Sequence, residues 1–238
     1  MQVYCGLSSC CINVYGSKTK ADFPTTYRDF ICEHGAPSAL RRENALEEQS
    51  ESVSAIHHEF YIKDEWSEPY HQHQNPVESQ AIRYLSEHVH LLLDTTGAPD
   101  SAWYHAAVYL ADVHNILANE QLPDSIPPLQ YCTGVTQDIS AYLQFTFWKS
   151  VLYLDHEQSW PSSKERSGNW LGIAHNIVDA LTFWVFDDQS KCLLARSVLR
   201  PHHHNHSVTW DPTSAEPAKN SGQMGGIQFP LLSFSPVF

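Results

Sequence analysis

Basic residues are scarce in this chain. Its 238 residues include 14 lysines and arginines against 27 aspartates and glutamates, so the formal net charge is −13. The deficit is concentrated in residues 1–120, which carry 7 basic and 17 acidic side chains. Phosphate binding depends on clustered lysine and arginine, and no basic run is present. The composition therefore argues against tight binding of duplex DNA.

Cysteine pairs at the spacing of zinc ligands are missing. None of the six cysteines belongs to a C-x-x-C pair, which makes a zinc knuckle unexpected, and we expect reduced thiols in an intracellular protein. The six positions are Cys5, Cys10, Cys11, Cys32, Cys132 and Cys192.

Long apolar runs are also missing. No stretch approaches the roughly 20 apolar residues that span a bilayer. The N-terminus does not combine a basic segment with an apolar run, so we expect no signal peptide and no membrane partner.

The strongest helical pattern runs from Asn75 to Leu93. Asn75 is a favourable N-cap, and Pro76 suits the first helical position because its missing N–H has no partner there. Apolar residues recur at spacings of three and four, and Gly97 marks the end of the helix. Glu78 falls in the first turn, where the helix dipole stabilises a carboxylate.

Shorter patterns surround this helix. The order of elements they predict is β-β-α-β-α-β-α, which indicates an α/β fold. The predicted strands lie within residues 3–14, 38–42 and 61–66, and the predicted helices cover residues 19–33, 47–60 and 101–119.

The second half of the sequence is rich in aromatic strand-like segments. Pro123, Pro127 and Pro128 predict a boundary near residues 120–140. Five apolar segments between residues 143 and 200 then predict a small β-barrel, with a hairpin turn at residues 187–190. We expect Gly168 and Gly172 to allow a turn and a tight bend. The segments are LQFTFW, SVLYLD, NWLGIA, LTFWVFD and KCLLARSVL.

Two acidic residues stand at element ends that can converge. Glu43 follows the predicted strand 38–42, and Glu78 begins the helix 35 positions later. Mg²⁺ favours one or two carboxylates with water and phosphate oxygens. On spacing alone, a helix-capping glutamate and a solvated glutamate are the favoured interpretation, because many acidic pairs lie this far apart.

The segments HGAPSALRRENA and EPYHQHQNPVES resemble the integrase core of copia-type LTR retrotransposons, and the similarity extends over roughly residues 1–210. The matching positions are Asn44, Pro69, Gln74, Asn75 and Glu78. The resemblance implies a ribonuclease H-like fold, DNA as partner, an intracellular location in nucleus or cytoplasm, and DNA-end joining with Mg²⁺. It makes Glu43 and Glu78 the catalytic and metal-binding residues.

The family's acidic triad is degenerate here. Glu43 replaces the second aspartate, and an extra methylene displaces its carboxylate by about 1.5 Å, whereas catalytic groups tolerate errors of about 0.5 Å. The sequence also starts at what resembles the family's second strand, so we expect the first strand and its aspartate to be missing. The leading hypothesis is therefore a truncated, inactive integrase-like remnant, a pseudoenzyme.

The resemblance also covers the predicted barrel. Residues 170–173 and 195–198 occupy the places of two motifs in the SH3-like module that follows copia-type integrase. The expected domains are an integrase core over residues 1–120, a linker over 121–142, an SH3-like barrel over 143–200 and a disordered tail over 201–238.

Two other functions stay open. One is an active integrase core with a misassigned start. The other is a non-enzymatic module that binds nucleic acid or protein through exposed aromatics. Those aromatics would be Trp148, Trp170, Phe183 and Trp184, although core packing is the favoured interpretation for them.

Two groups of histidines are possible metal ligands. One is the 202–206 cluster, and the other is His71 with His73 near Glu78; for both we favour exposed polar segments. The sequence leaves open whether the chain forms a homo-oligomer.

Overall fold

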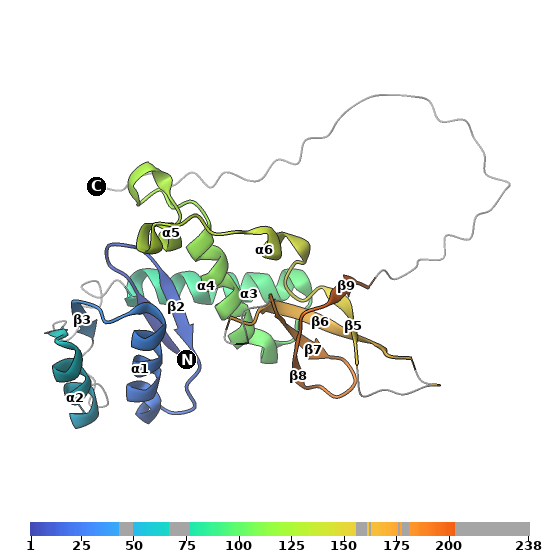
Figure 1. Ribbon diagram of the computed structural model, residues 1–238, viewed down its shortest axis with the longest axis horizontal. Coiled ribbons are helices and arrows are strands. Elements are labelled where there is room, and N and C mark those ends of the chain that lie inside the picture. The colour runs from blue at the N-terminus through green and yellow to red at the C-terminus, as the bar shows by residue number, and fades with distance from the viewer. Residues whose placement is uncertain are drawn as a thin grey trace. The chain divides into compact units, whose positions relative to one another are not determined.

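The computed structural model describes residues 1–42, 50–66, 77–155, 161, 163–175, 177 and 181–202, and for residues 42 and 78–80 only the backbone. All of them belong to one compact unit, Met1–His202. The chain is a mixed helix and sheet protein, which agrees with the expected α/β class (Figure 1).

The N-terminal part contains four short strands and two helices. Strands β1 (Gln2–Cys5) and β2 (Ile12–Tyr15) form an antiparallel hairpin, and strands β3 (Ala39–Arg42) and β4 (Lys63–Trp66) pair in parallel. The turn η1 (Lys20–Asp22) leads into helix α1 (Phe23–His34), and helix α2 (Glu51–Phe60) connects β3 to β4. Each element falls within, or within one residue of, a range that the sequence predicts.

The two strand pairs are separate sheets that share one hydrophobic cluster. Within the described ranges, β1 pairs only with β2, and β3 only with β4. Tyr4 of β1 and Leu40 of β3 nevertheless pack with the buried side chains of α1 and α2, including Tyr27 and Ile56. Helices α1 and α2 therefore hold together two sheets that do not pair with each other.

A pair of helices covers the other face of the hairpin. The predicted helix from residue 75 begins in the structure as a π-helical turn, η4 (Val77–Ile82), and continues as α3 (Arg83–Thr96). The expected stop is confirmed, because Gly97 adopts a left-handed conformation with φ 68° after α3. A turn, η5 (Asp100–Ala102), then begins helix α4 (Trp103–Ile116).

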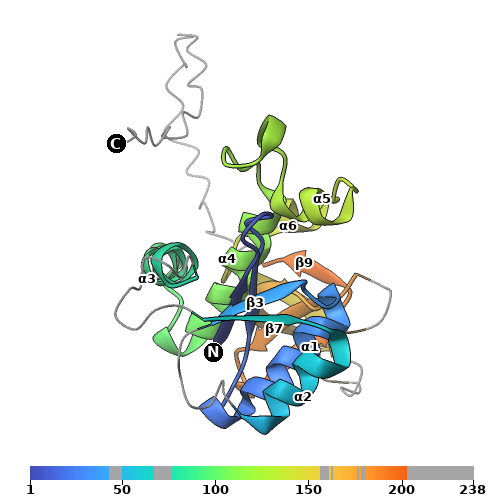
Figure 2. The ribbon, with the colours of Figure 1, turned by 90° about the vertical axis from the view of Figure 1, so that its left-hand side faces the viewer.

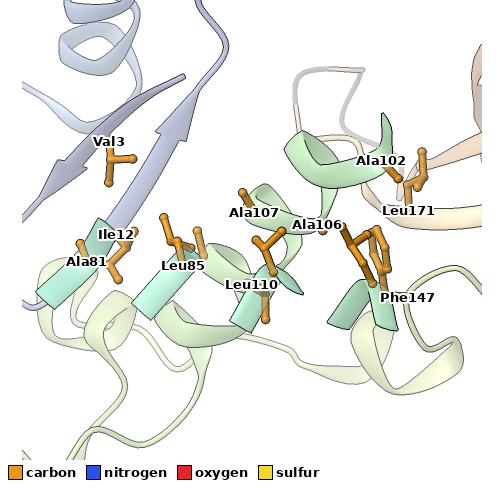
Figure 3. Close-up of a cluster of buried hydrophobic side chains, with 13 residues drawn as sticks. Val3, Ile12, Ala81, Leu85, Ala102, Ala106, Ala107, Leu110, Phe147 and Leu171 are labelled. Carbon is orange, nitrogen blue, oxygen red and sulfur yellow. The ribbon is translucent and has the colours of Figure 1, made fainter. Parts of the chain in front are cut away.

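The main core lies between the hairpin and the C-terminal sheet. Val3 and Ile12 of the hairpin lie at one end of this cluster, Leu85 of α3 lies in the middle, and Phe147 and Leu171 lie at the other end (Figure 3). In Figure 2, α3 is seen almost end-on beside α4. Side chains from both halves of the sequence thus build a single core around α3 and α4.

Asn115 joins α4 to the outer edge of the hairpin. Its side chain is buried, accepts a hydrogen bond from the Ile12 N–H at 2.8 Å and donates one to the Ile12 C=O at 2.8 Å. These backbone groups point away from β1. The Gly6 N–H donates a hydrogen bond to the Cys11 carbonyl oxygen, so the next pair along the hairpin, Cys5 and Ile12, is the one without mutual hydrogen bonds. Asn115 therefore satisfies a strand edge that would otherwise be left without partners.

Replacing Asn115 by alanine is expected to reduce the free energy of unfolding by about 2 kcal/mol, because two buried backbone groups lose their only side-chain partner. Chemical denaturation of the variant measures this change. Asn119→Ala is the matched control, because the Asn119 carboxamide accepts one exposed hydrogen bond from the Gln121 N–H. Equal stability of the two variants would contradict the role assigned to Asn115.

The chain between the core helices and the C-terminal sheet contains three short helical segments joined by loops. They are η6 (Pro123–Ser125), α5 (Pro128–Thr133) and α6 (Ser140–Gln144). The expectation that Leu143–Trp148 is a strand is wrong, since this segment covers the end of α6 and a turn in which Trp148 has φ 60°. Phe145 and Phe147 are buried although they lie outside a strand, and an alternating apolar pattern does not distinguish the two cases.

Five antiparallel strands form the C-terminal sheet, in the order β8-β7-β6-β5-β9. They are β5 (Ser150–Leu154), β6 (Glu165–Ile173), β7 (Phe183–Asp187), β8 (Leu193–Arg196) and β9 (Leu199–Pro201). The edge strands of a flat five-stranded sheet lie about 19 Å apart. A link from residue 196 to residue 199 spans at most about 11 Å, so the sheet must curl until its two edges approach each other.

The two glycines of β6 differ in their roles. Gly172 has φ 143° and lies at a register shift after Trp170, so the expected bend is a β-bulge. Gly168 lies inside the strand, and the expectation of a turn there is wrong. A Cβ on Gly168 would come within 2.7 Å of the Phe186 carbonyl oxygen, which makes glycine necessary for the close approach of β7.

Candidate functional site

The structure describes the predicted acidic pair, Glu43 and Glu78, only in part. Strand β3 ends at Arg42, so Glu43 follows it directly but lies outside the described residues. Glu78 is the second residue of η4, and only its backbone is described. That the two carboxylates share a metal ion therefore stays a prediction.

The elements that carry the pair are well fixed. Arg41 of β3 and Glu65 of β4 lie opposite each other in the parallel pairing of the two strands. The Arg41 guanidinium forms an ion pair with the Glu65 carboxylate at 3.1 Å. The turn η4 packs against β1, and Ala81 is 1% exposed in the main core. Glu78 thus begins a helix beside the hairpin, while Glu43 follows the strand pair that shares α1 and α2 with that hairpin.

Among the described residues, no group of three or more histidine, cysteine, aspartate or glutamate side chains could hold a metal ion. In the 202–206 histidine cluster only His202 is described, and its Nδ1 lies 3.1 Å from the Ser150 hydroxyl oxygen. The other histidines of that cluster, with His71 and His73, lie outside the described ranges.

The aromatic residues proposed as a binding face are mostly core residues. Trp170 is 0% exposed and Phe183 is 3% exposed. Trp148 and Trp184 are partly buried against the main core. Neither Trp170 nor Phe183 can stack on a partner without unfolding of the sheet, so core packing, the favoured interpretation, is correct for them.

Several basic side chains of the described residues form ion pairs with acids. Arg28 pairs with Glu59, Lys63 with Glu65, and Arg166 with Asp155, at 3.0, 3.1 and 2.9 Å. In each pair a carboxylate competes with phosphate for the positive charge. These ion pairs and the net charge of −13 both weaken the attraction of this protein for phosphate.

A cluster of three polar side chains lies where α4, α6 and the end of β6 meet. The His175 Nε2 lies 3.1 Å from an Asp112 carboxylate oxygen and 3.3 Å from the Tyr142 hydroxyl oxygen. The hydrogen bond with Asp112 raises the pKa of His175 above its usual value, although burial opposes the shift. Burial, and then the Asp112 charge, raise the pKa of Tyr142. The cluster therefore favours the protonated form of the His175 ring, and it ties the sheet to the core helices.

Asp112→Asn is expected to lower the pKa of His175, because the raised value depends first on the carboxylate. A raised folded-state pKa contributes stability below the unfolded value near 6.5, and this contribution is lost as pH rises through the folded value. NMR titration of the His175 ring measures the change directly. Asp94→Asn, at an exposed position on α3, is the control, and an identical His175 titration in both variants would contradict the assignment.

A second cluster surrounds the carboxylate of Asp187, which is 0% exposed at the end of β7. It accepts hydrogen bonds from the Tyr153 hydroxyl and the Ser190 N–H, both at 2.7 Å, and Arg166 lies 4.0 Å away. Burial alone would raise the pKa of Asp187, but the hydrogen bonds from Ser190, Tyr153 and Gln189 outweigh it and lower the pKa to about 2. This carboxylate is saturated by donors inside the protein, so its role is to hold the hairpin turn against β5.

Three resolved features were missed by sequence reasoning: the Asn115 clamp, the Asp112–Tyr142–His175 cluster and the partners of Asp187. Each depends on contacts between residues that lie far apart in the chain. Of the three features, only the Asp187 cluster had a local sequence signal, the hairpin turn predicted at residues 187–190. That turn is confirmed.

No protein-family model and no curated protein matches the sequence. Among solved structures, the chain is similar to a chain of the simian T-cell lymphotropic virus intasome in complex with PP2A regulatory subunit B56 gamma. The TM-score is 0.46 at 10% sequence identity, and the match covers 84% of this chain and 70% of the other. None of the helices in the described part of the chain is long and apolar enough to cross a membrane.

Proposed function

We propose that this chain is an integrase-like protein of the copia type, with a ribonuclease H-like core and an SH3-like barrel, and that it does not catalyse strand transfer. Glu43 and Glu78 are the remaining members of its Mg²⁺ site. The observation that carries the proposal is the position of the two glutamates: one follows β3 directly, and the other begins a helix packed against β1.

The arrangement of strands supports the fold part of the proposal. In the family, the first strand lies in the middle of the sheet. The residues that follow that strand would form an antiparallel hairpin and a parallel strand–helix–strand unit on a common helical layer. The pairs β1–β2 and β3–β4 have this relation to α1 and α2. The curled sheet of β5 to β9 suits the small barrel that is expected to follow.

The identity of one site residue supports the loss of activity. Glu43 stands where the family has the shorter aspartate. A misplacement of about 1 Å at a catalytic group can cost roughly 100-fold in rate. The net charge of −13 further weakens contact with DNA.

Mn²⁺ binding tests the shared site. Paramagnetic Mn²⁺ is expected to broaden the amide NMR signals of Ala81 and Ile82 in the native protein, and Glu78→Gln is expected to remove the effect. Glu87→Gln is the matched control, because Glu87 is an exposed glutamate further along the same helix. If the broadening is absent, or survives Glu78→Gln, the two glutamates do not form a metal site.

A strand-transfer assay with labelled DNA ends tests inactivity separately. We expect no joined product with either Mg²⁺ or Mn²⁺. Product that forms and is lost in Glu78→Gln would overturn the proposed loss of activity and establish the alternative, an active integrase core.

A further inference from the structure

Two cysteines from distant parts of the sequence lie in contact. The Sγ atoms of Cys11 and Cys132 are 3.2 Å apart, although the residues are 121 positions apart in the chain. Cys11 is buried just before β2, Cys132 is exposed on α5, and both are free thiols. A disulfide bond is about 2.04 Å long, so the sulfurs need to approach each other by about 1.2 Å.

Helix α4 fixes the position of Cys11 from one side. The His114 Nε2 donates a hydrogen bond to the Cys10 carbonyl oxygen at 3.0 Å, and Asn115 holds both backbone groups of Ile12. Cys11 therefore lies between two residues that α4 holds in place. Helix α5, which carries Cys132, also packs against α4. The contact between the thiols follows from elements anchored on the same helix.

We propose that Cys11 and Cys132 form a reversible intramolecular disulfide, with a small-molecule disulfide such as oxidised glutathione as the oxidant. The Cys132 thiolate attacks one sulfur of the oxidant, and one glutathione leaves as thiolate and takes up the proton that Cys132 released. The Cys11 thiolate then attacks the Cys132 sulfur of the mixed disulfide and expels the second glutathione. Two protein thiols are oxidised, and one glutathione disulfide is reduced to two thiols.

The order of the two steps follows from exposure. Cys132 is open to solvent, so it is the thiol that a dissolved oxidant reaches first. Burial, with the hydrogen bond to Cys132, raises the pKa of Cys11 to about 12, which makes Cys11 a poor first nucleophile. Once the mixed disulfide has formed, Cys11 is already in contact with the sulfur it attacks, and this proximity favours closure over a second encounter in solution.

The crosslink would join the hairpin to α5 across the helices of the main core. Opening of the hairpin away from α4 would then require movement of α5 as well. The proposal is independent of the proposed function, because neither cysteine belongs to the elements that carry Glu43 and Glu78.

Incubation of the folded, full-length protein with oxidised glutathione tests the proposal. Non-reducing peptide mapping by mass spectrometry is expected to show a Cys11–Cys132 crosslink, accompanied by a loss of two hydrogens from the intact protein, and a thiol reductant should reverse it. Hydrogen exchange at the amides of β1 and β2 is expected to slow in the oxidised protein.

Three variants make the result specific. Cys132→Ser, at an exposed position, should abolish the crosslink, whereas Cys11→Ser should leave a lasting glutathione adduct on Cys132. Cys192→Ser, which removes another exposed thiol, should leave the crosslink intact. A wild-type protein that retains a stable glutathione adduct on Cys132, with Cys11 still open to alkylation after unfolding, would overturn the proposal. A crosslink that uses Cys10, and therefore disappears in Cys10→Ser, would do the same.

Discussion

Replacing Trp170 by alanine is expected to lower the free energy of unfolding by about 4 kcal/mol, the cost typical of a fully buried tryptophan. Its ring is 0% exposed and contacts the rings of Tyr109, Phe145 and Phe183, with centroid distances of 5.7, 6.1 and 6.3 Å. Tyr109 belongs to α4, so the substitution loosens the sheet from the core helices as well as emptying its interior.

Urea denaturation followed by circular dichroism measures the loss. Trp103→Ala is the matched control, because Trp103 is 46% exposed on α4, and a change below about 1 kcal/mol is expected there. Trp170→Phe separates ring packing from the indole N–H. The Trp170 Nε1 has no hydrogen-bond partner in the described part of the protein, so phenylalanine should cost much less than alanine. Similar losses for Trp170→Ala and Trp103→Ala would show that Trp170 is not a central core residue.

Asp187→Ala is expected to cost about 3 kcal/mol, because it leaves the buried Tyr153 hydroxyl and the Ser190 N–H without their acceptor. Asp187→Asn keeps the shape and one acceptor oxygen, so it should cost less. Asp188→Asn is the control at the neighbouring position, where the carboxylate accepts one hydrogen bond from the Asn169 side chain at 2.8 Å. Equal losses in Asp187→Ala and Asp188→Asn would contradict a special role for the buried carboxylate.

The Asp187 contribution should also depend on pH in a defined direction. Its folded-state pKa of about 2 lies below the ordinary value of 3.8, so the carboxylate stabilises the folded state above the ordinary value. That contribution is lost as pH falls through the folded value, and it amounts to about 2 kcal/mol at 1.36 kcal/mol per pKa unit. The stability difference between the native protein and Asp187→Asn should therefore shrink from pH 5 to pH 2. A difference that stays constant over this range would contradict the lowered pKa.

Local sequence patterns located most of the helices and strands. The predicted stop at Gly97, the hairpin turn at 187–190 and the strand at 38–42 all reflect the conformational preferences of a few neighbouring residues. The same reasoning failed at Leu143–Trp148, where alternating apolar residues belong to a helix end and a turn. It also missed the π-helical turn at Val77–Ile82, because the apolar repeat of a helix does not reveal a local change in hydrogen bonding.

The functional residues also fall into two groups: those that local sequence indicated and those that only contacts between distant residues revealed. Glu43 and Glu78 were selected from motif order and from their places at element ends, and those backbone places are consistent with β3 and η4. The sequence could not reveal the contact between Cys11 and Cys132, or that between Asp112 and His175, because these residues lie 121 and 63 positions apart. No local pattern encodes which side chains a distant helix brings together.

The sequence by itself predicted a mixed helix and sheet class, the order of elements up to residue 116, the acidic charge and the two glutamates that follow a strand and begin a helix. These properties depend on residue type and on neighbours within about one or two helical turns. Only the tertiary structure decided that the hairpin and the sheet share one core through α3 and α4, that Trp170 is buried, and that Cys11 touches Cys132. Those outcomes depend on how separate elements pack, and packing is set by the combined shape of many side chains rather than by any one segment.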